Sequence, residues 1–67
     1  MIPLFINGES IELPQSMTVA ALLEVRGLAG KRVAVERNGE IVPKSQHASV
    51  AIQAGDRLEI VVAVGGG

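Results

Sequence analysis

The most apolar stretch of this chain is LEIVVAV, residues 58–64 of 67. Its even-numbered residues are all large and aliphatic, and this period of two is typical of a β-strand. Because both faces of the segment are largely apolar, we predict that it lies in the middle of a sheet.

Two hairpins are predicted upstream of this strand. Residues 2–6 alternate in the same way, with Ile2, Leu4 and Ile6 facing a core, and the return strand carries Ile11 and Leu13. The Asn-Gly pair at residues 7–8 suits a tight turn in which both residues need a positive φ. Residues 32–37 and 40–42 repeat the arrangement around a second Asn-Gly pair, at 38–39. Proline ends each return strand, because it cannot donate to a sheet ladder.

A short helix is predicted between the hairpins. Thr18 is a suitable N-cap, and Val19, Leu22 and Leu23 form an apolar stripe at helical spacing. Gly27 is placed to close the helix in a left-handed conformation. About two turns of helix do not stand alone in water, so this helix needs a sheet to pack on. The sequence therefore predicts an α+β fold, a mixed sheet of about four or five strands with one helix packed across one face.

Composition narrows the class of protein. The chain has no cysteine, 48% hydrophobic residues, a single aromatic residue and a formal net charge of −1. Without disulfides or a cysteine-based zinc site, it must fold on an aliphatic core alone. It has no basic block and no clustered aromatic residues, which argues against nucleic acid as a partner. No apolar run reaches the length of a membrane span, and the first residues lack a signal-peptide pattern, so we expect a cytoplasmic protein.

Three stretches of the sequence are similar to one known family. They are TVAALL at residues 18–23, VAVERNGEIVPKS at residues 33–45, and GDRLEIV at residues 55–61 running on to the terminal glycines. With the order of elements, they make the whole chain resemble the sulfur carriers of thiamine biosynthesis, the ThiS type, which have the ubiquitin-like β-grasp fold. One departure is His47, where that family often has a bulky aromatic residue. The resemblance implies a β-grasp domain over residues 1–64 and a flexible Gly-Gly-Gly tail over residues 65–67.

The resemblance also implies a function and its partners. An adenylating enzyme of the ThiF type would activate the terminal carboxylate of Gly67 with ATP, and a cysteine desulfurase would supply sulfur. The resulting thiocarboxylate would donate its sulfur to thiazole synthase, of the ThiG type. The chain itself would be a protein co-substrate and not an enzyme, with no cofactor or metal of its own. We expect it to be a monomer when free.

The residues near the C-terminus suit the role of a sulfur carrier. Gly65 and Gly66 have no side chain, so they can thread into the narrow active site of a partner, and three extended residues reach about 10 Å. Phe5, Val61 and Ala63 are expected to face away from the core, beside the tail, as an apolar docking patch for the partner.

The remaining polar residues are expected to have ordinary surface or structural roles. His47 has no second histidine or cysteine with which to bind a metal. Basic residues at 32, 37, 44 and 57 form either a partner-facing rim or ordinary surface charge. The acidic residues at turns and strand edges are expected to lie on a solvated surface: Glu9, Glu12, Glu36, Glu40, Asp56 and Glu59.

Three other functions stay open at this point. The first is another sulfur-carrying β-grasp protein, such as the small subunit of molybdopterin synthase, which is usually longer. The second is a ubiquitin-like modifier, which would be joined through Gly67 to lysines of other proteins. The third is a β-grasp interaction module with an inert tail, whose binding would survive the loss of Gly66 and Gly67.

Overall fold

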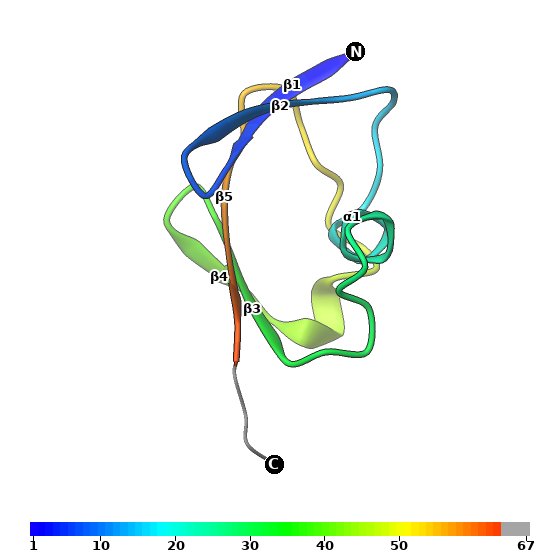
Figure 1. Cartoon of the computed structure of the whole chain (residues 1–67), viewed down its shortest axis with the longest axis vertical. Helices are drawn as coiled ribbons and strands as arrows, with labels where there is room; N and C mark the ends of the chain where they lie inside the picture. The colour runs from blue at the N-terminus through cyan, green and yellow to red at the C-terminus, as the bar shows by residue number, and fades with distance from the viewer. Residues whose placement is uncertain (64–67) are drawn as a thin grey trace.

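Residues 1–63, the part of the chain that the computed structural model describes, form one mixed sheet with a helix on one face (Figure 1). The strands are in the order β2-β1-β5-β3-β4, and β5 runs parallel to β1 and antiparallel to β3. The last strand is therefore central, as predicted. The elements are β1 (Ile2–Ile6), β2 (Glu9–Leu13), α1 (Val19–Val25), β3 (Val33–Arg37), β4 (Glu40–Val42), the 3₁₀ turn η1 (Lys44–Gln46) and β5 (Arg57–Val62).

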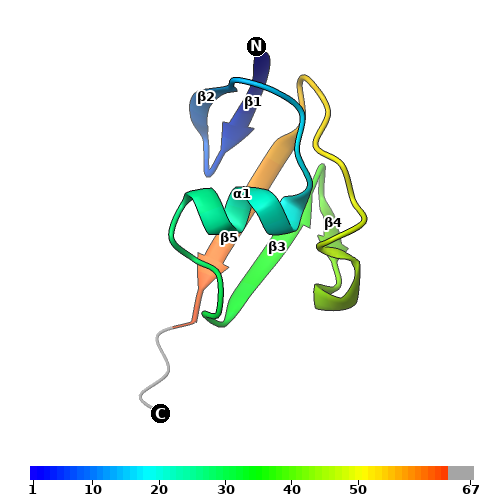
Figure 2. The same cartoon turned by 90° about the vertical axis from the view of Figure 1, so that its right-hand side faces the viewer.

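The helix α1 crosses the sheet in front of β5 and β3 (Figure 2). Val19, Leu22 and Leu23 are buried against the sheet, which confirms the predicted apolar stripe. Burying an aliphatic side chain of this size stabilises a fold by about 1.5–3 kcal/mol, so this layer holds the short helix in place. The other buried core residues come from all five strands and from the segment before β5: Leu4, Ile6, Leu13, Val35, Val42, Ile52, Leu58 and Ile60.

Both ends of α1 form as predicted. The Thr18 hydroxyl accepts a hydrogen bond from the backbone N–H of Ala21 at 3.1 Å, so it satisfies one of the free donors of the first turn. At the other end, Gly27 has a φ of 73°, in the left-handed region that a residue with a side chain rarely adopts.

The two Asn-Gly turns are also confirmed, and each of them contacts β5. Asn7 and Asn38 have φ values of 52° and 53°. The Asn7 side-chain oxygen accepts from the N–H of Ile60 at 2.8 Å, and its NH₂ group donates to the carbonyl of Ile60 at 3.1 Å. The Asn38 side-chain oxygen accepts from the N–H of Arg57 at 2.9 Å. Both hairpin turns therefore fasten the central strand, which the sequence did not reveal.

The segment between β4 and β5 completes the molecule. The 3₁₀ turn η1 begins at Lys44, directly after Pro43. Further on, Ile52 is buried and its N–H donates to the carbonyl of Met17 at 2.9 Å. Within residues 1–63 no helix has the length and the hydrophobicity that crossing a bilayer requires.

Candidate functional site at the end of β5

The candidate site is the end of β5, because the residue predicted to carry sulfur follows this strand in the sequence. After Val62, the N–H of Ala63 donates to the carbonyl of Arg32 at 2.9 Å. This bond holds the last described residue against the loop that leads into β3. The predicted tail residues, Gly65 to Gly67, and the predicted domain boundary after residue 64 lie outside the described residues.

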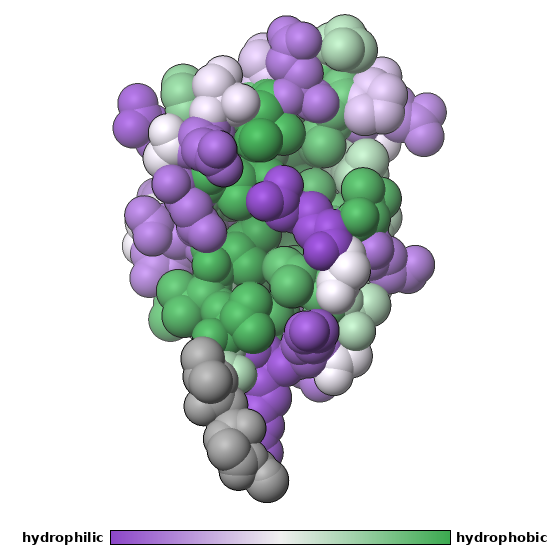
Figure 3. Space-filling view, in the orientation of Figure 1, coloured by the Kyte–Doolittle hydropathy of each residue, from purple (hydrophilic) through white to green (hydrophobic). Residues whose placement is uncertain are grey.

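The face of the sheet away from α1 carries the residues predicted as a docking patch. Phe5, Val61 and Ala63 are all exposed, Phe5 at 39% and Val61 at 60% of their surface. Val61 lies opposite Ala34 of β3, so small and aliphatic side chains are neighbours near the end of β5. Figure 3, in the orientation of Figure 1, shows apolar surface at the lower left of the molecule, where β5 ends.

The structure does not bring Phe5 next to the other two patch residues. In the sheet Phe5 lies opposite Arg57, which is four residues, or about 13 Å, from Val61 along the strand. Glu59 faces the same side between them. The Arg57 guanidinium lies over the Phe5 ring, 5.2 Å from its centroid, in a cation–π arrangement. The predicted patch therefore consists of two apolar areas on one face, separated by a charged residue.

A comparison with known protein families shows which family the chain belongs to. A model of the ThiS family matches residues 4–67, which is almost the whole chain. The chain belongs to the ThiS family. This confirms the resemblance read from the three sequence stretches, and the match extends beyond β5 through the terminal glycines.

Curated relatives of this ThiS-family chain include longer proteins. A thiazole synthase from Paramagnetospirillum magneticum is 58% identical over 64 residues, which are 96% of this chain and 20% of that protein. A thiazole synthase from Magnetococcus marinus is 37% identical over 62 residues, 92% of this chain and 19% of that protein. A protein of Porphyra purpurea named ycf40, described as uncharacterized, is 32% identical and is covered over 87% of its length. The ThiS-family chain thus spans about a fifth of the two thiazole synthases.

Solved structures of similar proteins have the same fold. The crystal structure of the thiamine biosynthesis protein ThiS from Geobacter metallireducens matches with a TM-score of 0.84 at 29% identity, over 98% of this chain and 100% of that one. An NMR solution structure of a thiamine biosynthesis protein from the same organism matches with a TM-score of 0.79, also at 29% identity, over 98% of this chain and 88% of that one. These matches confirm the ubiquitin-like β-grasp fold.

Asp56 corrects one expectation about this ThiS-family chain, since it does not lie on a solvated surface. Only 5% of its surface is exposed, and its carboxylate accepts hydrogen bonds from Arg37 Nε (2.7 Å), Asn38 Nδ2 (3.1 Å) and the N–H of Gln53 (2.8 Å). Burial by itself would raise the pKa of Asp56, but these hydrogen bonds and the charge of Arg37 together hold the pKa below its ordinary value of 3.8. Asp56 and Arg37 therefore fix the turn that leads into β5. Nothing local in the sequence identifies residues so far apart as partners.

His47, at which this sequence differs from the usual ThiS-type pattern, is buried and links neighbouring elements. It is 8% exposed, and its Nε2 atom lies 3.1 Å from the carbonyl oxygen of Val42. Because a carbonyl only accepts, Nε2 carries the hydrogen of this bond. The His47 carbonyl in turn accepts from the N–H of Ala20 at 2.8 Å, so this residue ties η1 both to β4 and to α1. Among residues 1–63, no group of three or more histidine, cysteine, aspartate or glutamate side chains is arranged to hold a metal ion.

Proposed function

We propose that this chain is a sulfur carrier of thiamine biosynthesis, in which Gly67 is first adenylated and then carries sulfur as a thiocarboxylate. The observation that carries this proposal is the ThiS-family match, which covers residues 4–67 and so includes the terminal glycines. The match to a solved ThiS thiamine biosynthesis protein over 98% of the chain supports the same role. The glycines follow in the sequence directly after β5, the strand that pairs with β1 and β3.

The chemistry explains why the carrier needs a partner enzyme. A free carboxylate is a poor electrophile, because attack on it would add charge to an anion. Reaction with ATP joins AMP to the Gly67 carboxylate and releases pyrophosphate. Hydrosulfide then attacks the acyl carbon; a C–S bond forms, the C–O bond to AMP breaks, and AMP leaves with that electron pair. The groups that stabilise these transition states belong to the adenylating enzyme, and glycine presents no Cβ to hinder the attack.

The proposed partners are an adenylating enzyme of the ThiF type, a cysteine desulfurase as the sulfur source, and a thiazole synthase of the ThiG type as the acceptor. Support for the third comes from the two relatives named thiazole synthase, each of which contains a segment similar to this chain. A carrier segment within such a protein keeps sulfur donor and acceptor at a high effective concentration. The chain acts here as a co-substrate in the cytoplasm, and the adenylating enzyme binds the ATP. Gly65 and Gly66 thread into the partner's active site, while Phe5, Val61 and Ala63 contact its surface.

Intact-protein mass spectrometry tests the proposal. The chain is incubated with a ThiF-type enzyme, ATP, cysteine, cysteine desulfurase and a thiol reductant that releases hydrosulfide. The starting mass must first agree with a chain whose last residue is Gly67. We then expect a mass gain equal to the exchange of one oxygen for sulfur, dependent on ATP and absent from a variant that lacks Gly67.

Two controls separate the remaining functions. Addition of a ThiG-type thiazole synthase with its other substrates should return the carrier to its starting mass as the thiazole forms, whereas a molybdopterin-type carrier would keep its sulfur. A protein modifier would instead form adducts with lysines of other proteins. If an adenylating enzyme that is active on another ThiS protein leaves this chain unchanged, the carrier role is wrong.

A further inference from the structure

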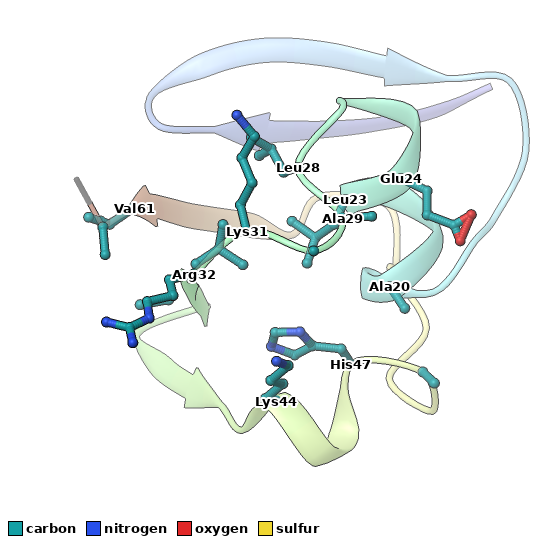
Figure 4. Close-up of a pocket in the computed structure, with 15 residues that line it drawn as sticks. Ala20, Leu23, Glu24, Leu28, Ala29, Lys31, Arg32, Lys44, His47 and Val61 are labelled. Carbon is teal, nitrogen blue, oxygen red and sulfur yellow. The ribbon is translucent and has the colours of Figure 1, made fainter. Parts of the chain in front are cut away.

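A hollow of about 600 Å³ lies between α1, the loop before β3 and the turn after η1 (Figure 4). This volume is in the range of pockets that bind ligands. The space is open because six of the residues that line it are small: Ala20, Ala29, Gly30, Ala34, Ala48 and Ala63. Leu23, Leu28 and Val33 add larger apolar surface.

The charged residues around the hollow are mostly basic. Lys31 and Arg32 come from the loop before β3, Lys44 comes from η1 beside His47, and Glu24 comes from α1 (Figure 4). Half of the chain's six basic residues therefore lie here, although its formal net charge is −1. All three basic residues are exposed, so their charges are available to an acidic partner.

The strand β3 has an open edge beside this hollow. On one side, β5 pairs with β3 along its whole length, from Val33 to Arg37. On the other side, β4 pairs only with residues 35–37. Within the described part of the chain, no strand covers Val33 and Ala34 on that side. Arg32 and Asn38 bond to β5, and bonding directions alternate along an antiparallel strand, so Val33 is the residue that turns its backbone N–H and carbonyl to this open side. An extended peptide can pair with backbone groups presented in this way.

We propose that the hollow and the open half of β3 bind an extended segment of a partner protein in which aliphatic and acidic side chains alternate. The aliphatic side chains fill the space over Leu23 and Leu28, and the carboxylates pair with Lys31, Arg32 and Lys44. Val61 and Ala63 also line the hollow, so a protein bound there lies beside the end of β5. This binding does not require any reaction at Gly67.

An NMR titration tests this interaction. The ¹⁵N-labelled full chain is titrated with the probe peptide acetyl-Glu-Leu-Glu-Leu-Glu-amide. We expect the amide signals of Val33, Ala34 and Ala48 to shift in a saturable way, and those around Phe5, which pairs with the opposite end of β5, to stay in place. Two control peptides, with lysine in place of glutamate and with serine in place of leucine, should each bind at least about tenfold more weakly, because one reverses the charge and the other removes the apolar contact.

Variants of the chain separate the two parts of the binding site. Lys44→Glu should weaken binding of the glutamate–leucine peptide roughly tenfold at low salt, since an attraction becomes a repulsion. The difference in affinity between this variant and the unchanged protein should shrink as the salt concentration is raised. Ala48→Leu fills the hollow and should weaken binding without any dependence on salt. Arg26→Glu, a charge reversal outside the lining residues, is the matched control and should bind as the unchanged protein does. The melting temperature of each variant shows that it folds.

Three results would overturn the proposal. The first is the absence of any shift at millimolar peptide in a folded protein. The second is equal binding of the lysine and glutamate peptides. The third is that inorganic phosphate or ATP, at matched ionic strength, shifts the same signals at lower concentration than the peptide, which would make the hollow a site for small anions.

Discussion

Asp56 shows what one buried carboxylate does in a small domain. It joins the Arg37 guanidinium, the Asn38 amide and the Gln53 N–H at the turn before β5. Burial raises the pKa of Asp56, but the three hydrogen bonds and the charge of Arg37 outweigh it, so this pKa lies below 3.8 in the folded protein. A group whose folded pKa is depressed stabilises the fold above its unfolded pKa, and this contribution is lost as the pH falls through the folded pKa.

We therefore predict that Asp56→Asn lowers the free energy of unfolding at pH 7 by about 1–3 kcal/mol, because the charge-assisted bond from Arg37 is lost. The deficit should shrink as the pH falls below about 3.8, where the original carboxyl also becomes protonated. Urea unfolding at pH values from 7 to 2 measures this. Glu9→Gln, at an exposed acid of β2, is the control. A deficit that is the same at every pH would contradict the ionic role of Asp56.

The strand β5 depends on residues from both hairpins. The parallel pairing between β1 and β5 covers only Phe5–Arg57 and Ile6–Leu58. Beyond that point the Asn7 side chain takes the place of a strand, since it bonds to both the N–H and the carbonyl of Ile60. A turn residue thus extends the support of β5 toward the end that carries the glycines.

The substitution Asn7→Gly tests how much this contact contributes to the stability of the fold. Glycine keeps the positive φ of the turn but removes both side-chain bonds, which leaves two backbone groups of Ile60 without their partner. We expect a loss of about 1–3 kcal/mol in the free energy of unfolding and faster hydrogen exchange at the Ile60 amide. Ser10→Ala, on the exposed surface of β2, should change neither quantity. Unchanged exchange at Ile60 in Asn7→Gly would show that the contact does not matter in solution.

Across the whole molecule, the two sides of the sheet have different surfaces. One side is closed by α1, and the other is exposed, with Phe5 at one end and Val61 at the other. Charge is also uneven, since the basic residues not engaged by Asp56 or Phe5 are Arg26 and the three around the hollow. A partner that approaches the end of β5 therefore meets an apolar face and a basic rim together.

We predict that Phe5→Asp and Val61→Asp fold but are poor substrates for the adenylating enzyme, because a carboxylate would be buried in an apolar contact. Val61→Asp should have the larger effect, at least about tenfold in kcat/KM, since Val61 is closer to the end of β5. The rate of ATP-dependent pyrophosphate release measures activation. Val25→Asp, at an exposed apolar residue of α1, should behave as the unchanged protein does. Normal kinetics for both variants on the sheet would remove the docking role of this face.

Most of the secondary structure could be predicted because its causes are local. Alternation in residues 2–6, the stripe at Val19, Leu22 and Leu23, and the two Asn-Gly turns each depend on neighbours within a few residues. The central place of the last strand also followed, because its apolar residues need cover on both sides. At the candidate site, the alternation of residues along the strands correctly predicted that Phe5 and Val61 lie on one exposed face. The predicted role of Gly67 came from the family resemblance alone.

Patterns within the sequence therefore predict the set of elements, the faces they bury and the ThiS resemblance. Folding sets how far Phe5 lies from Val61, which partners Asp56 and Asn7 bind, and where the basic hollow opens beside β3. The physical reason is that these features depend on the register of β5 between β1 and β3, which joins residues as far apart in sequence as Asn7 and Ile60. Local periodicity fixes which way a side chain points along its strand, but it does not fix which residue of another strand lies opposite.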